Sequence, residues 1–264
     1  MKEILRSALM LCIICSCGLS TNAQVIKNDD TIVNQWASDS LQIDGDLKDW
    51  GDSLKYFNEN TNFSFNLRNN NETIYLAIKS RDKQNLSRIL ARGISFSINS
   101  EGKKKPGATV IFPLVARSSQ PQKPTTPNKD SKEVQKQILK RIQQIFVTGF
   151  PEIIDGPVSM KNTYGISAAA GFDTQDNLIV EVAIPFSHLG FTAEQNLIAC
   201  LIEINGVKPP RTAYDPYREE RNRRNRMYGY PTRDYNFDRR PGVNKQNLAT
   251  GFWIKSALAK NLNN

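Results

Sequence analysis

Residues 63–78, with the sequence FSFNLRNNNETIYLAI, decide the fold class of this chain. Apolar residues occupy every second position on both sides of the Asn69–Glu72 turn: Phe63, Phe65 and Leu67 before it, and Ile74, Leu76 and Ile78 after it. A period of two places such side chains on one face of a half-buried strand. Asparagine-rich segments favour turns. The stretch therefore predicts a β-hairpin.

Short alternating segments continue along the chain and are separated by turn residues. They span residues 94–98, 109–112, 164–170, 178–184, 197–204 and 251–255. Strands this short and this numerous favour an antiparallel β-sandwich, immunoglobulin-like or jelly-roll-like. We predict a mostly β protein with one sandwich domain over 41–258, preceded by a polar segment at 24–40 and followed by a polar tail at 259–264.

Three segments depart from this pattern. Residues 117–132 are rich in Pro, Gln, Ser, Thr and Lys, which predicts a mobile loop. Residues 133–146 carry apolar side chains at helical spacing, which predicts an amphipathic helix that packs on the sheet or caps one end of it. Residues 208–241 form an insertion with ten basic and five acidic residues and several tyrosines.

The first 23 residues have the layout of a secretory signal peptide: a basic start, an apolar run over 8–19, and small or polar residues before a cut at Gln24. The apolar run is shorter than the about 20 residues that span a bilayer. A second interpretation is a lipobox over 14–18, in which Cys17 becomes a lipid-anchored first residue. Both predict an exported protein that is periplasmic, outer-membrane-associated or secreted, with no transmembrane segment in the mature chain.

Composition limits the chemistry of this chain. Its 264 residues carry a net charge of +9 and are 39% hydrophobic, which is typical of a globular protein. Cys12, Cys15 and Cys17 lie in the predicted signal, so the mature chain keeps only Cys200, in an apolar run that predicts a buried thiol. With one histidine as well, zinc sites built from Cys and His are excluded. No cofactor is predicted apart from the calcium considered below.

Three motifs come in a recognisable order: Ile43–Trp50 (IDGDLKDW), Asn71–Ile78 (NETIYLAI) and Glu181–Phe186 (EVAIPF). Together they resemble family 9 carbohydrate-binding modules and their DOMON-like relatives, from about residue 41 to residue 255. The layout is similar to exported envelope proteins of that superfamily with no assigned activity. The resemblance implies a β-sandwich that recognises a glycan or another envelope ligand.

The acidic turn holds a candidate metal site. Asp44, Asp46 and Asp49 offer the hard oxygen ligands that Ca²⁺ prefers. The resemblance implies structural calcium, because several modules of this kind carry it. The alternative, which we favour, is a turn with solvated carboxylates, because six to eight oxygens are needed and the others are unidentified.

Aromatic rings are candidates for sugar binding, since they contact the C–H faces of sugar rings. Trp50 and Trp253 have apolar neighbours and are predicted to be core residues. Trp36 lies in a polar context and is the candidate platform among the tryptophans.

The Arg/Tyr insertion is the second candidate ligand site. Its predicted ligand-binding residues are Tyr214, Tyr217, Arg221, Arg223, Arg224, Arg226, Tyr228 and Tyr230. Arginine forks pair with phosphate, sulfate or carboxylate, and tyrosines stack on sugars. The predicted partners are a glycan, an anionic envelope polymer or lipid, or an envelope protein; nucleic acid is not expected for an exported protein. The alternative is a solvated loop with internal Glu/Arg pairing.

No catalytic constellation is visible in the sequence. His188 follows Phe186 and Ser187 at the end of a strand, where a turn explains it. Glu181 and Glu203 could form a carboxylate pair, but alternation explains Glu181 as an outward strand residue. We therefore predict a non-catalytic carbohydrate-binding-like module, with an interaction protein as the alternative and a hydrolase as the third hypothesis.

Overall fold

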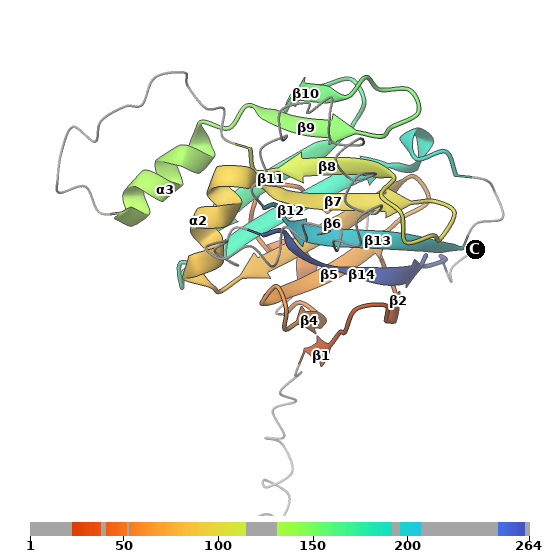
Figure 1. The fold of residues 1–264 in the computed structure, drawn as a ribbon, viewed down its shortest axis with the longest axis horizontal. Coiled ribbons are helices and arrows are strands. Elements are labelled where there is room, and N and C mark those ends of the chain that lie inside the picture. Colours follow the sequence, from red (N-terminus) through yellow and green to blue (C-terminus); the bar gives the residue numbers. More distant parts are fainter. Residues whose placement is uncertain are drawn as a thin grey trace, which may run out of the picture.

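The protein is a sandwich of two seven-stranded sheets in a computed structural model (Figure 1). The structure describes residues 23–37, 41–51, 53–114, 131–191, 196–206 and 248–261. The predicted mostly β sandwich is confirmed. The predicted signal peptide with Cys17, most of the 117–132 loop and the 208–241 insertion lie outside the described residues.

The first sheet, sheet A, is built around the predicted hairpin. Its strands are, in spatial order, β1 (Gln24–Val25), β4 (Tyr56–Asn58), β5 (Phe63–Asn69), β6 (Thr73–Ser80), β12 (Leu178–Pro185) and β11 (Ser167–Phe172), with β3 (Gln35–Trp36) paired to β5. The hairpin register places Phe65 opposite Ile78 and Leu67 opposite Leu76. Pro185 is the last residue of β12, as expected of a residue without an amide for the ladder.

The second sheet, sheet B, contains most of the later strands. In spatial order these are β10 (Gly156–Ser159), β9 (Gln144–Thr148), β8 (Ala108–Phe112), β7 (Ile94–Asn99), β13 (Leu197–Ile204), β14 (Thr250–Ala257) and β2 (Thr31–Val33). Both β1 and β2 pair in parallel with their neighbours, at one edge of each sheet. The sandwich therefore begins before residue 41, where the sequence analysis set its boundary.

The core lies between the sheets and is mostly apolar, with a few buried polar residues such as Asn34, Asn69 and Ser256, which are joined by hydrogen bonds. Phe65 of sheet A meets Phe252 of sheet B with ring centroids 5.2 Å apart, so the two sheets are in direct contact. Cys200 is fully buried in β13, which confirms the predicted core thiol, and burial raises its pKa. Trp253 corrects a prediction: its neighbours Phe252 and Ile254 are buried in the core, but alternation turns Trp253 to the outer face, where it is half-buried.

Two helices lie at one end of the sandwich (Figure 1). Helix α2 (Lys83–Arg92) begins at Asp82, whose side chain accepts a hydrogen bond from the Gln84 amide at 2.8 Å. Helix α3 (Ser131–Lys140) corresponds to the predicted helix, but it ends six residues early. Residues 144–146 belong to β9 instead, because Ile145 and Val147 alternate inward in the sheet. Within the described ranges, no helix is long and apolar enough to cross a bilayer.

Candidate binding site

Residues 41–51, with 53 and 54, cross the outer face of sheet A and are called the cover loop here. The loop contains a short 3-10 helix, η1 (Lys48–Trp50). Trp50 and Leu54 pack on Ala77 of β6 and form a second apolar cluster with partly buried Leu41, Leu47 and Tyr75. Trp50 is only 2% exposed, so the prediction that it is a buried residue is confirmed. The loop thus has a small core of its own on the outer side of the sheet.

Glu181 fastens the cover loop to β12. One of its carboxylate oxygens accepts hydrogen bonds from the Gly45 and Asp44 amides at 2.6 and 3.1 Å, and the other accepts one from the Trp50 indole at 2.5 Å. The side chain points outward from the sandwich core, as alternation predicts, but the cover loop buries it completely. Burial raises the pKa of Glu181 to about 7, although the three N–H donors favour the ionised form.

Gly45 brings the loop backbone onto β11. Its φ of +85° is in the left-handed region, and a Cβ there would lie 2.8 Å from the backbone carbonyl carbon of Ala170. A Cβ at Gly171 would lie 2.5 Å from the Gly45 carbonyl oxygen. Both positions require glycine because the two backbones are in contact.

Arg68 of β5 holds the other end of η1. Its guanidinium donates to the carbonyl oxygens of Asp49 at 2.8 Å and Trp50 at 2.7 Å. The same group lies 5.1 Å from the centroid of the Trp50 ring, a cation–π distance. The cover loop is therefore fixed to β5, β12 and β11, and it packs on β6, which lies between β5 and β12.

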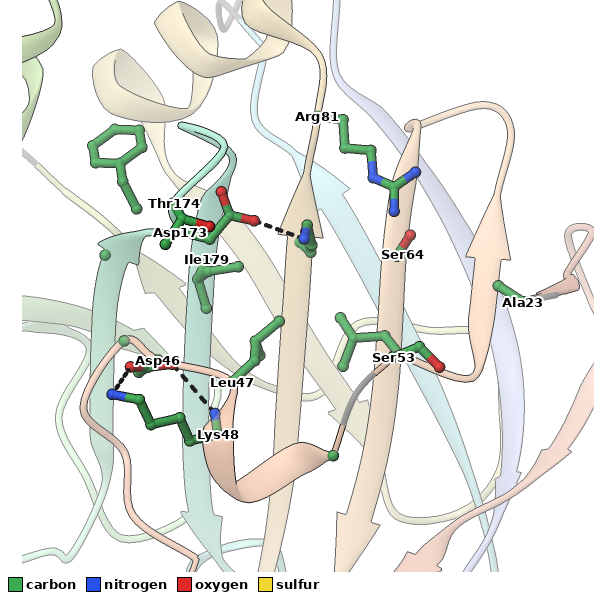
Figure 2. Close-up of a pocket in the computed structure, with 16 residues that line it drawn as sticks. Ala23, Asp46, Leu47, Lys48, Ser53, Ser64, Arg81, Asp173, Thr174 and Ile179 are labelled. Carbon is green, nitrogen blue, oxygen red and sulfur yellow. Dashed lines mark hydrogen bonds and ion pairs between the residues drawn. The ribbon is translucent and has the colours of Figure 1, made fainter. Parts of the chain in front are cut away.

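A pocket with a volume of about 530 Å³ lies between the cover loop and the outer face of sheet A (Figure 2). This volume is within the range of small-molecule sites. Its apolar walls come from Leu47, Leu54, Phe172 and Ile179. Its polar walls come from Asp46, Lys48, Ser53, Ser64, Lys79, Arg81, Asp173 and Thr174.

Two ion pairs stand in this pocket. Lys79 of β6 contacts Asp173, just after β11, at 2.6 Å, and Lys48 contacts Asp46 at 2.5 Å within the cover loop. Burial alone would raise the pKa of Asp173, but hydrogen bonds from Lys79, the Asn177 side chain and backbone amides lower it to about 2. The pKa of Asp46 is lowered by the hydrogen bond from Lys48. Both carboxylates are therefore acceptors at neutral pH.

The predicted calcium ligands are used differently in the structure. Asp44 accepts the Asp46 amide, Asp46 accepts the Lys48 amide, and Asp49 accepts the Gln42 amide. In the part of the chain that the structure describes, no three His, Cys, Asp or Glu side chains form a group that could hold a metal ion. Of the three, only Asp46 lines the pocket. The calcium site stays a prediction.

Of the other predicted site residues, those that the structure describes do not line this pocket. Trp36 is half-buried in β3 and is not among the lining residues. The Tyr214–Tyr230 and Arg221–Arg226 candidates lie outside the described residues. Glu181 and Glu203 lie on different sheets, β12 and β13, so they do not form a carboxylate pair.

Sequence reasoning did not identify Lys79, Arg81 and Asp173 as site residues. The signal for Lys79 was its outward position in β6, between the inward-facing Ile78 and Ser80. That position does not reveal which distant segment covers it, because the pairing of β6 with β12 and the approach of the cover loop are long-range contacts.

Comparison with known proteins gives one distant likeness. No protein-family model and no curated protein matches the chain. Among solved structures, the chain is similar to a carbohydrate binding module family 9 (CBM9) from Caldicellulosiruptor kristjanssonii in complex with glucose, at 8% identity and a TM-score of 0.38. The match covers 89% of this chain and 100% of that chain. A likeness at this level assigns neither a family nor a ligand to the chain.

Proposed function

We propose that this protein is a non-catalytic binding module that takes a saccharide in the pocket between the cover loop and sheet A. The observation that supports the proposal is the arrangement of two ion pairs beside apolar side chains in one open pocket of about 530 Å³. Most of the polar lining residues, among them Asp46, Lys48, Lys79 and Asp173, lie outside the apolar core clusters and can contact a ligand.

The chemistry of a sugar suits this lining. Each hydroxyl both donates and accepts hydrogen bonds, so neighbouring hydroxyls match a carboxylate beside an ammonium group. The pocket has two such carboxylate–ammonium pairs, Asp46 with Lys48 and Asp173 with Lys79. Leu47 and Ile179 lie between them in Figure 2. Leu47 is partly exposed and offers apolar contact to the C–H face of a ring, whereas Ile179 is buried at the base of the pocket.

The pocket is formed before any ligand binds. Glu181 and Arg68 hold the cover loop in place, and Gly45 locks its backbone against β11. A preformed site avoids the entropy cost of ordering a loop on binding.

The test is a glycan array probed with the purified protein at low and high salt, with calcium or with a chelator. Ser64→Ile fills the pocket with a larger side chain on an outward strand position that tolerates β-branched residues. Ser167→Ile is the matched control, since Ser167 is an outward strand serine of sheet A that does not line the pocket. We expect the parent and Ser167→Ile to bind and Ser64→Ile to lose binding. Equal binding by both variants would place the ligand elsewhere.

The same array separates the alternative, a protein whose Arg/Tyr insertion docks on anionic lipid or an envelope partner. Binding that survives Ser64→Ile and disappears at high salt would support that alternative, because screening weakens contacts between exposed charges. The export signal, the calcium site and this insertion stay predictions from the sequence.

A further inference from the structure

The charges of the pocket are not balanced. Its lining has three cations, Lys48, Lys79 and Arg81, and two carboxylates, Asp46 and Asp173. The two lysines are each paired with one of the carboxylates. Across the ranges that the structure describes, no carboxylate pairs with Arg81. One positive charge is therefore left over at the site.

Arg81 is also well placed to reach a ligand. It follows the last residue of β6 directly, and its side chain is exposed to solvent. In Figure 2 its guanidinium points toward Ser64 on the neighbouring strand, at the opposite side of the pocket from the Asp46–Lys48 pair. A hydroxyl and a guanidinium fork thus flank the same open space.

A neutral saccharide would leave Arg81 without an anionic partner, whereas an acidic saccharide would provide one. In Figure 2 Arg81 lies on one side of the pocket, and Asp173 and the Asp46–Lys48 pair lie on the other. The groups that would bind hydroxyls are therefore separate from the group that would bind a charge. The planar guanidinium fork matches the two oxygens of a carboxylate.

We propose that the pocket selects saccharides that carry a carboxylate, the uronic acids, and that Arg81 pairs with that carboxylate. This inference rests on the proposed function, because it names the class of sugar that the same pocket takes. The ion pairs bind ring hydroxyls, Leu47 contacts the ring, and Ser64 donates a further hydrogen bond to the carboxylate.

The experiment measures affinities for matched oligosaccharide pairs. Oligomers of galacturonic, glucuronic and mannuronic acid are compared with their methyl esters, which keep the ring and the hydroxyls but lose the charge; a sulfated galactan serves as a second anion. We expect the acids to bind about fivefold more tightly than the esters, as an exposed charge pair gives. The preference shrinks at high salt.

Three variants identify the residue. Arg81→Gln should remove the preference, so that the acids and the esters bind with equal affinity. Arg81→Lys should retain only part of it, because the charge stays and the fork is lost. Arg141→Gln is the control: Arg141 is an exposed arginine beyond α3 that does not line the pocket, and the change in net charge is the same.

The outcomes are distinguishable. If acids and esters bind equally, and Ser64→Ile abolishes the binding of both, the uronic acid inference is overturned and saccharide binding in the pocket stays in place. Binding of the sulfated galactan as tightly as the uronates would also overturn it, since selection would then follow charge alone. No binding to any member of the panel would overturn both proposals. A preference that survives Arg81→Gln would move the charge recognition to another residue.

Discussion

Glu181 is the single residue on which the cover loop most depends. Its pKa of about 7 lies above the 4.5 of an ordinary glutamate, so the folded protein keeps a proton that the unfolded chain releases between these pH values. The stability that this proton contributes is present in full below about pH 4.5 and is lost as the pH rises toward 7.

We therefore expect the free energy of unfolding to fall by about 1 kcal/mol per pH unit from this group between pH 5 and 7. Glu181→Gln removes the titration and should flatten that part of the curve. Glu72→Gln, at an exposed glutamate of the β5–β6 turn, should leave the curve as it is. Urea unfolding at pH 5, 6, 7 and 8 measures the difference, and parallel curves for Glu181→Gln and the parent would contradict the assignment.

The tryptophans give a second prediction at the level of single residues. Trp50 is 2% exposed and donates to Glu181, so Trp50→Ala should destabilise the protein by about 3–5 kcal/mol. Trp253→Ala removes a half-buried ring on the outer face of sheet B and should cost clearly less. Denaturant unfolding followed by circular dichroism compares them; equal losses would show that Trp50 does not hold the loop.

At the scale of elements, the cover loop has two glycines with positive φ, Gly45 and Gly51. Substituting each by alanine distinguishes the cost of backbone strain from the cost of a steric contact. A Cβ at Gly51, with φ +87°, meets no atom within 4 Å, whereas a Cβ at Gly45 meets the β11 backbone at 2.8 Å. Gly51→Ala should cost about 1–3 kcal/mol from its backbone conformation alone.

Gly45→Ala should cost more than Gly51→Ala, because it also pushes the loop away from β11. It should weaken saccharide binding as well, since Gly45, Asp46 and Leu47 are consecutive pocket residues. Unfolding free energies and array binding of the two variants give both readouts. Similar losses of stability in the two would mean that the loop shifts without resistance.

The two helices show which boundaries a local sequence pattern can predict and which it cannot. The helix predicted over 133–146 merged α3 with β9, because Ile138, Ile142 and Ile145 fit a helical period while Ile145 and Val147 also fit a strand. Helix α2 was not predicted, although Asp82 as its cap, Leu86, Ile89 and Leu90 at helical spacing, and Gly93 after it were all in the sequence.

At the scale of the whole molecule, Cys200 reports on global unfolding. It is 0% exposed in β13, between β7 and β14, and burial raises its pKa, so the thiolate is absent while the sandwich is intact. We expect alkylation at Cys200, followed by peptide mass spectrometry, to be negligible in buffer and rapid in denaturing urea. Fast labelling in buffer would show that the sheets open locally around β13.

The sandwich itself was predictable because most of its longer strands carry their own alternation, as residues 63–67 and 74–78 do. The pocket was not, because its parts are far apart in the chain. Residues 79–81 and 173–174 come together through sheet pairing, and residues 46–48 reach them on the cover loop. Glu181 illustrates the same limit, since alternation gives its direction and a loop 136 residues earlier decides its burial. The Arg/Tyr insertion gives a strong charge signal, yet the described pocket is formed by residues outside it.

The short strands β1 and β2 at the start of the described chain have a consequence for handling the protein. They occupy the outer edges of sheets A and B, next to β4 and β14, and cover backbone groups there. Proteolysis or a truncation that removes residues 23–33 would uncover two strand edges at once. The same cut removes Ile26 and Ile32 from the core. Uncovered edges are templates for pairing with another chain, so such a fragment should aggregate.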